Sequence, residues 1–221
     1  MRDHEPVSRL QGQQVSDAGL TGWANLLGGL QTRVVTPDFA TGLALVNAIA
    51  AAAQELDHHP DLHLRHNLLG VRLTSHDPGG ITARDLRLAR RISTLVAEAG
   101  LELGSEGLTR VELGLDSPAA ATIAPFWAAV LALAPPAHDA DELPDPSGSA
   151  PTVWFQPSGA DETRQRWHPD LWVDPGDVRP RIDAALAAGG TLISEAEAPA
   201  FWVLADPEGN RVCLCTWQDR D

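Results

Sequence analysis

The sequence predicts an α+β fold divided between two domains, and three observations carry this prediction. Apolar side chains recur at helical spacing over residues 39–56. Residues 62–66 and 68–75 instead alternate apolar and polar side chains, as half-buried strands do. Glycine interrupts the chain at residues 104–107, after which a second series of strand and helix patterns begins. We therefore expect an antiparallel sheet with helices on one face, followed by a separate C-terminal domain.

The composition limits the partners that the protein can have. The chain has 221 residues, 43% of them apolar, and a net charge of −14. A nucleic-acid partner is not expected, because such proteins need a basic surface. No apolar run predicts a membrane span and no leader pattern opens the chain, so we expect a cytoplasmic protein without a membrane partner. Cys213 and Cys215 are two residues apart and do not suggest a disulfide framework.

Local signals delimit the first domain. Residues 1–16 are polar and lack periodicity, which predicts a loose N-terminal arm before a domain at residues 17–103. A short strand is predicted at residues 31–36. Residues 104–107 are the predicted linker, and the second domain is expected at residues 108–221.

Capping and breaking residues set the limits of the two predicted helices. Pro37 and Asp38 mark the start of the first helix, and Pro60 prevents its continuation. The second helix begins with a capping-box pattern, Thr82 and Asp85, and Gly100 ends it.

Histidines gather where these elements meet. Five of the eight histidines lie between Glu55 and Asp85, namely His58, His59, His63, His66 and His76. His58 and His59 follow the first helix, His76 ends a strand eighteen positions after His58, and Thr82 begins the next helix. Because imidazole gives and takes protons near neutral pH, the stretch predicts an active site for proton transfer. A metal site and a solvated loop are the alternatives, although no HxxxH or CxxC spacing is present.

Three separated motifs in this stretch carry a resemblance to a known family. They are Asp57-His58-His59-Pro60-Asp61, Thr74-Ser75-His76-Asp77, and Gly80-Ile81-Thr82 with Arg84-Asp85. Over residues 30–100 the chain resembles pterin-4a-carbinolamine dehydratases, whose members dehydrate a 4a-hydroxytetrahydropterin to the quinonoid dihydropterin.

The resemblance implies a set of site residues and no cofactor. His58, His59 and His76 are the implied catalytic residues, and both steps are proton transfers that need neither metal nor nucleotide. Acid and base work is assigned to His58 and His76, and substrate orientation to His59. The implied substrate-binding residues are Asp57, Pro60, Asp61, Thr74, Ser75 and Asp85, with Asp85 supporting the site. A pterin is the expected partner, in a homo-oligomeric enzyme.

Some positions depart from the family pattern. Leu62 and His66 stand where aromatic residues are common, and Gln54 replaces a frequent acidic residue. A non-catalytic pterin-binding or interaction module is therefore one alternative. In a second alternative, the C-terminal domain is the working enzyme and the first is a scaffold.

The second domain has the pattern β-α-β followed by β-α-β-β-β. Strands are predicted at residues 110–115, 152–156, 167–173, 191–194, 201–205 and 211–217, and helices after Pro118 and at 178–188, with an acidic loop at 135–150. Pro125-Phe126-Trp127 and the turn at residues 206–210 go with this order. Over residues 108–218 the chain resembles the glyoxalase/bleomycin-resistance (vicinal oxygen chelate) superfamily, which implies paired βαβββ modules that bind a small molecule or serve assembly.

That superfamily commonly binds a divalent metal. The corresponding positions here hold Thr109, His168 and Cys213. Because only His168 matches, we predict no metal site, with His168 as a wall residue of a pocket.

Overall fold

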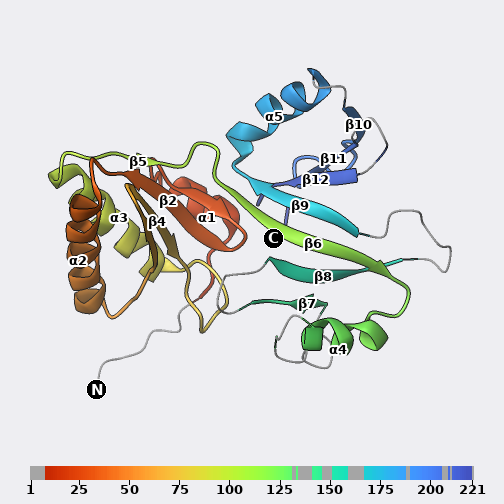
Figure 1. Cartoon of the computed structure of the whole chain (residues 1–221), viewed down its shortest axis with the longest axis horizontal. Coiled ribbons are helices and arrows are strands. Elements are labelled where there is room, and N and C mark those ends of the chain that lie inside the picture. The colour runs from red at the N-terminus through yellow and green to blue at the C-terminus, as the bar shows by residue number, and fades with distance from the viewer. Residues whose placement is uncertain are drawn as a thin grey trace. The chain divides into compact units, whose positions relative to one another are not determined.

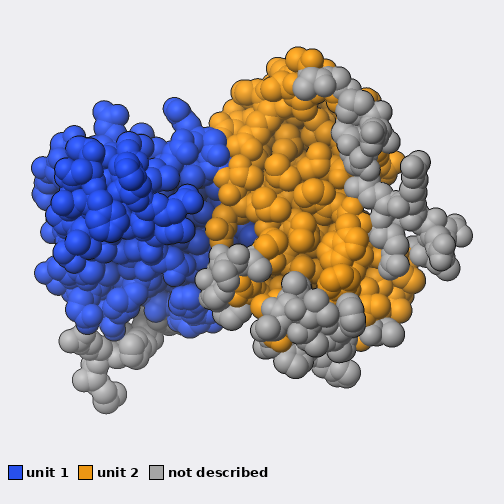
Figure 2. All heavy atoms as spheres, in the orientation of Figure 1, with its two compact units in different colours: residues 1–108, 217–221 blue, residues 109–216 orange. Residues whose placement is uncertain are grey.

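A computed structural model describes residues 8–130, 133, 141–145, 151–158, 167–187, 190–205, 209 and 211–220. The chain divides into two units, drawn in two colours in Figure 2 and as a ribbon in Figure 1. Unit 1 comprises Met1–Leu108 together with Trp217–Asp221, and unit 2 comprises Thr109–Thr216. Each unit has its own hydrophobic core.

Unit 1 is built on an antiparallel sheet in the order β1-β2-β4-β3, with β5 paired to β2. Leu30 of β2 lies opposite Leu73 of β4, and Leu62 of β3 lies opposite Val71. This register puts the apolar residues of β2 and β4 on one face of the sheet. The strands are β1 (Ala24–Leu26), β2 (Gly29–Val35), β3 (Asp61–Arg65), β4 (Leu68–Leu73) and β5 (Leu103–Gly104).

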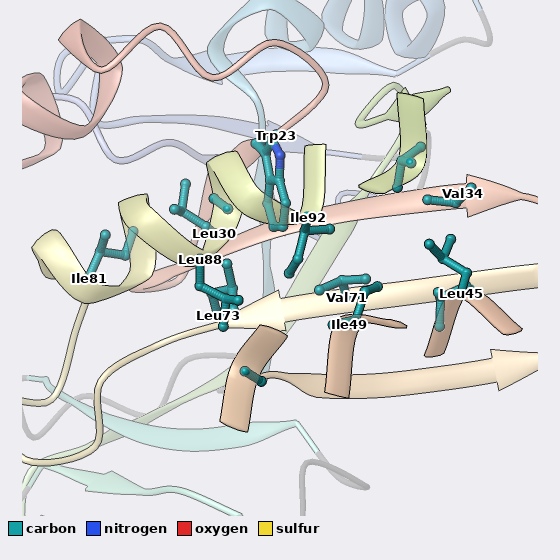
Figure 3. Packing of buried hydrophobic residues seen from close by; sticks show 14 of the residues in the cluster. Trp23, Leu30, Val34, Leu45, Ile49, Val71, Leu73, Ile81, Leu88 and Ile92 are labelled. Carbon is teal, nitrogen blue, oxygen red and sulfur yellow. The ribbon is translucent and has the colours of Figure 1, made fainter. Parts of the chain in front are cut away.

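Two long helices, α2 (Phe39–Leu56) and α3 (Ala83–Glu98), pack on that apolar face. Ile49 of α2 and Ile92 of α3 meet Val71 of β4 in one buried cluster (Figure 3). Burial of such a side chain contributes about 1.5–3 kcal/mol. The predicted antiparallel sheet with helices on one face is confirmed.

The ends of both helices follow the sequence signals. The Asp38 side chain accepts a hydrogen bond from the Thr41 amide at 2.7 Å, and it caps α2. Thr82 and Asp85 form the predicted capping box of α3. Gly100 then has a φ of +69°, a left-handed conformation that suits glycine and ends the helix.

The helix α2 is long and apolar enough to cross a membrane by length and composition, which the sequence analysis did not anticipate. Leu45, Ile49 and Ala53 of this helix are nevertheless buried in the core of unit 1. Its apolar composition therefore serves a packed face against the sheet.

The margins of unit 1 differ from the prediction. The expected loose arm contains a short helix, α1 (Gly12–Asp17), with Val15 in the core, while residues 1–7 lie outside the described residues. The predicted linker begins inside β5, because Gly104 pairs with Arg33 of β2. Trp217 belongs to unit 1, and its ring lies against Gly12. The contacts of Val15, Gly104 and Trp217 join residues that are far apart in the sequence, so periodicity could not predict them.

Unit 2 contains a mixed sheet in the order β10-β11-β12-β9-β6-β8-β7. The β6–β8 and β12–β9 pairs are parallel, whereas the β6–β9 pair is antiparallel. The elements are β6 (Thr109–Ser117), α4 (Ala120–Val130), β7 (Glu142–Leu143), β8 (Thr152–Pro157), β9 (Trp167–Val173), α5 (Pro175–Ala187), β10 (Thr191–Ser194), β11 (Phe201–Ala205) and β12 (Arg211–Cys215).

This order agrees with the glyoxalase-like fold class. The module from β9 to β12 is a complete β-α-β-β-β unit, while the described residues of the first module have two strands after its helix. Apolar residues of β6 and β8 pack with α4, and those of β9, β11 and β12 pack with α5. Most of the predicted loop at 135–150, most of the turn at 206–210, and the side chains of Pro125 and Phe126 lie outside the described residues.

Candidate functional site

The end of α2 turns His58 into unit 1. Asp57 is left-handed, with φ 49° and ψ 42°, and the His58 amide donates to the Ala53 carbonyl at 3.1 Å. This cap reverses the chain at once, so that His58 is only 8% exposed. His59 is exposed and Pro60 is half-buried. The side chain of His58 is therefore buried, whereas that of the adjacent His59 is exposed to solvent.

Asp85, which is fully buried, is the centre of a hydrogen-bond network. Its Oδ2 accepts from the Thr82 amide at 2.7 Å, from the Ser75 hydroxyl at 2.8 Å and from the Thr82 hydroxyl at 3.1 Å. The two hydroxyls lie 2.9 Å apart. Three donors on one oxygen hold the carboxyl group of Asp85 in one orientation.

The other oxygen of Asp85 faces His58. The distance between Asp85 Oδ1 and His58 Nε2 is 2.7 Å, and both side chains are buried. Because a carboxylate only accepts, Nε2 carries the proton of this hydrogen bond. Neutral His58 then has its lone pair on Nδ1, the arrangement of an imidazole that a carboxylate orients to act as a base.

His76 follows Ser75, a member of the same network, in the chain. Its neighbour Ser75 forms an isolated bridge with Gly80, and the chain turns between them. His76 itself is exposed. Asp77 in this turn pairs with Arg84 on the first turn of α3. The Ser75–Gly80 bridge and the Asp77–Arg84 ion pair therefore both hold this turn, and the imidazole of His76 lies on its surface.

The structure joins some of the predicted residues and leaves others apart. His58, Ser75 and Asp85 share the network, and His59 and His76 each adjoin one of its members in the chain. Thr74 donates instead to the Gly28 carbonyl at 3.1 Å. Asp61 is exposed and pairs with Arg72 at 3.5 Å.

Thr82 is a member of the site that the sequence analysis treated only as a helix cap. Its amide and its hydroxyl both donate to Asp85. The signal was present in the capping-box spacing, because the acidic residue of such a box must lie next to the cap residue. What the spacing did not show is that the same carboxylate also holds His58.

The N-terminal segment also contributes to this region. The Leu10 amide donates to the Ile81 carbonyl at 2.8 Å, and the Arg9 side chain lies against Gly80. A Cβ on Gly80 would come within 2.9 Å of Arg9. The predicted loose arm therefore packs beside the turn that carries His76.

Unit 2 holds a second group of chemically active side chains. His168, Asp170 and Cys213 place one donor atom each within 4.8 Å of one another. His168 and Cys213 stand at two of the three positions that the superfamily resemblance singled out. The third, Thr109, is not in this group, and Asp170 was not predicted. These are the residues that could hold a metal ion.

Comparisons with known proteins agree with this two-part organisation. The family model described as pterin 4 alpha carbinolamine dehydratase matches residues 6–95. The model described as glyoxalase-like domain matches residues 112–215.

Curated relatives match the first of these parts. A protein of Thermomicrobium roseum is 38% identical over 35% of this chain and 84% of its own length. One of Aquifex aeolicus is 42% identical over 36% of this chain and 80% of its own length. Both carry pterin-4-alpha-carbinolamine dehydratase as a provisional name.

A solved structure from Brucella melitensis, titled transcriptional coactivator/pterin dehydratase, is 27% identical to this chain. The match covers 40% of this chain and 98% of that one, with a TM-score of 0.39. The family model over residues 6–95 and the two curated relatives place the chain in the pterin-4a-carbinolamine dehydratase family, to which it adds a glyoxalase-like domain at residues 112–215.

Proposed function

We propose that unit 1 dehydrates a 4a-hydroxytetrahydropterin to the quinonoid dihydropterin, as a 4a-hydroxytetrahydrobiopterin dehydratase in pterin recycling. The observation that carries the proposal is the buried contact between His58 and Asp85 at 2.7 Å. Family membership supports the reaction class, and the orientation of His58 by a carboxylate supports proton transfer as its chemistry.

The reaction requires one acid and one base. The C4a–O bond breaks as an acid protonates the departing hydroxyl, which leaves as water. A base takes the N5 proton, and the electrons of the N5–H bond form the C4a=N5 double bond. We assign the base to His58, whose Nε2 is held by Asp85, and the acid to the exposed His76. His59, exposed beside His58, orients the substrate.

Ser75 and Asp85 are assigned a positioning role in place of the substrate contact that the sequence suggested. Ser75 is 2% exposed, Asp85 is fully buried, and the polar atoms of both are used within the network. Asp57, Pro60, Asp61 and Thr74 remain proposed substrate contacts, because each is at least partly exposed.

Dehydration of chemically generated 4a-hydroxytetrahydropterin tests the proposal. His58→Ala and His76→Ala are each expected to lower kcat by roughly 10²–10⁴-fold, the usual effect of losing a general acid or base. His59→Ala is expected to raise KM more than it lowers kcat. The control is His63→Ala, since His63 is an exposed residue of β3 outside the network. If the His58, His59 and His76 variants all turn over like the wild type, the assignment is wrong.

A non-catalytic pterin-binding module is the second candidate, and it rests on Leu62 and His66. Leu62 is half-buried and His66 is exposed, at positions where the resemblance expects aromatic residues. Under this candidate, the wild-type chain binds a pterin in equilibrium dialysis but produces no quinonoid product above the uncatalysed rate.

We also propose that the protein is a homo-oligomer formed through unit 1. Val35, the last residue of β2, is 62% exposed, and Phe39 and Leu43 in the first turns of α2 are 53% and 46% exposed. Phe39 and Leu43 are one helical turn apart and therefore share a face. A second copy of the chain is the partner that would cover them.

A further inference from the structure

Helix α3 concentrates positive charge on the surface of an acidic protein. The net charge of the chain is −14, and its 16 basic residues are all arginines. Four of these arginines lie on α3 between Arg84 and Arg91. The acidic residues of the helix are Asp85, which is fully buried, and Glu98 at its end. Because like charges close together on a helix destabilise it, a ligand of opposite charge would relieve this cluster.

Three of the four arginines share one side of the helix. Arg84, Arg87 and Arg91 are three and four residues apart, which is the spacing of neighbours on a helix surface. Leu88 and Ile92 of the same helix are buried in the core (Figure 3). Arg87 and Arg91 are exposed, and neither forms an ion pair with another described residue. At 1.5 Å per residue, this arginine row extends over about 10 Å.

The arginine row begins at the turn that carries His76. Arg84, its first member, pairs with Asp77, the residue that follows His76. The Arg9 side chain lies against Gly80, where the same turn ends. Basic side chains therefore lie at both ends of the turn, and the row continues from it along α3. A ligand that contacts His76 meets positive charge as it extends from this turn.

We propose that the dehydratase site of unit 1 takes pterins whose C6 substituent carries an anionic group, a phosphate ester or a carboxylate, and that Arg87 and Arg91 bind this group. The inference rests on the proposed function and names the substrate class within it. A guanidinium group donates two parallel hydrogen bonds to a phosphate or a carboxylate, and these bonds are charge-assisted. A neutral hydroxyl substituent gains no such contact, so the arginine row distinguishes the two kinds of pterin.

Calorimetric binding titrations of the full chain test this preference. The probes are 6-hydroxymethylpterin, which has a neutral substituent, its monophosphate ester, and pteroylglutamate, whose tail carries carboxylates. We expect at least one anionic pterin to bind roughly ten-fold more tightly than the neutral one at low salt, since two exposed charge pairs are formed. The difference should shrink as added NaCl screens the charges. The anionic pterin with the larger gain identifies the group as phosphate or carboxylate.

Matched charge variants identify the arginines. Arg87→Glu and Arg91→Glu are each expected to lower the preference, measured as the ratio of the neutral to the anionic Kd, by roughly three- to five-fold. Arg87→Lys should keep part of it, because the charge remains. Arg65→Glu is the control, since this exposed residue pairs with Leu68, at the opposite end of β4 from His76. Circular dichroism establishes folding, and Arg87→Gln replaces any glutamate variant that unfolds.

Two outcomes would overturn this substrate class. They are equal binding of neutral and anionic pterins by the wild type, and a preference that survives in both glutamate variants. Turnover of the corresponding chemically generated 4a-hydroxytetrahydropterins separates the inference from the proposed function. Dehydration without any preference for an anionic substituent would leave the proposed function standing and remove the role of the arginines. An arginine-dependent preference in binding without turnover would contradict dehydration and retain the anion contact.

Discussion

Single residues decide how the candidate site works, and Asp85 is the clearest case. Asp85→Asn replaces one accepting oxygen by an NH₂ group, which leaves a donor facing a donor at Thr82 or at His58. We expect a loss of about 1–3 kcal/mol in the free energy of unfolding, typical of a buried polar group left unsatisfied. We also expect kcat to fall by roughly 10²-fold with little change in KM, because His58 loses its orientation.

Denaturant unfolding and steady-state kinetics measure both effects. Asp77→Asn is the control, because Asp77 is an exposed acidic residue whose partner is Arg84. An Asp85→Asn variant that is destabilised but retains wild-type kcat would show that the network serves only folding.

The carboxyl group of Asp38, which caps α2, should make the stability of the protein depend on pH. Hydrogen bonds from the Thr41 amide and, next in size, from the Thr41 side chain lower the pKa of this carboxyl below its ordinary value of 3.8. A carboxyl with a depressed folded-state pKa adds stability above its unfolded pKa, and that contribution disappears as the pH falls through the folded pKa. The wild type should therefore lose more stability than Asp38→Asn between neutral pH and acid, because asparagine caps the helix without titrating. Urea unfolding of both proteins across this pH range is the measurement. If their free energies of unfolding change in parallel with pH, titration of Asp38 does not contribute to stability.

At the scale of elements, the start of α2 is the place to test assembly. Leu43→Glu puts a charge on the exposed apolar face that Phe39 and Leu43 share, and we expect it to shift the protein to a smaller species. Leu186→Glu is the control, because Leu186 on α5 is 39% exposed but belongs to unit 2. Size-exclusion chromatography with light scattering gives the mass. An unchanged mass in Leu43→Glu would remove α2 from the interface.

Elements were predictable where one local rule sufficed. The apolar stripe and the Asp38 cap gave α2, and the Thr82–Asp85 spacing gave the start of α3. Gly104 was misplaced as linker because its partner, Arg33, is far away in the chain. The position of Asp170 opposite Cys213 was not predicted for the same reason, because it depends on a parallel strand pairing that local patterns do not encode.

At the scale of the whole molecule, the two units predict a separable dehydratase. A fragment ending at Leu103 would remove Gly104 from β5 and the Glu106 carbonyl that accepts from Arg33. Residues 1–108 keep both contacts and should fold with part of the dehydratase activity. This fragment lacks Trp217, whose ring lies against Gly12, so we expect a lower Tm than that of unit 1 in the full chain.

Calorimetry and the dehydratase assay on the fragment test this division. Trp217→Ala in the full chain is the matched comparison, because it removes the same ring without removing unit 2. A fragment that aggregates, beside a Trp217→Ala chain that unfolds like the wild type, would show that unit 1 depends on unit 2 for more than this ring.

Asp85 is used twice, in the capping box of α3 and as the partner of His58. Under the proposed function, this double use makes turnover sensitive to local opening of α3. When the first turn of α3 frays, the Thr82 amide exchanges with solvent and His58 loses its carboxylate in the same event. Temperature or mild denaturant should therefore reduce turnover before the global transition, in step with hydrogen exchange at that one amide. The turnover rate would then report the fraction of molecules in which the first turn of α3 is formed.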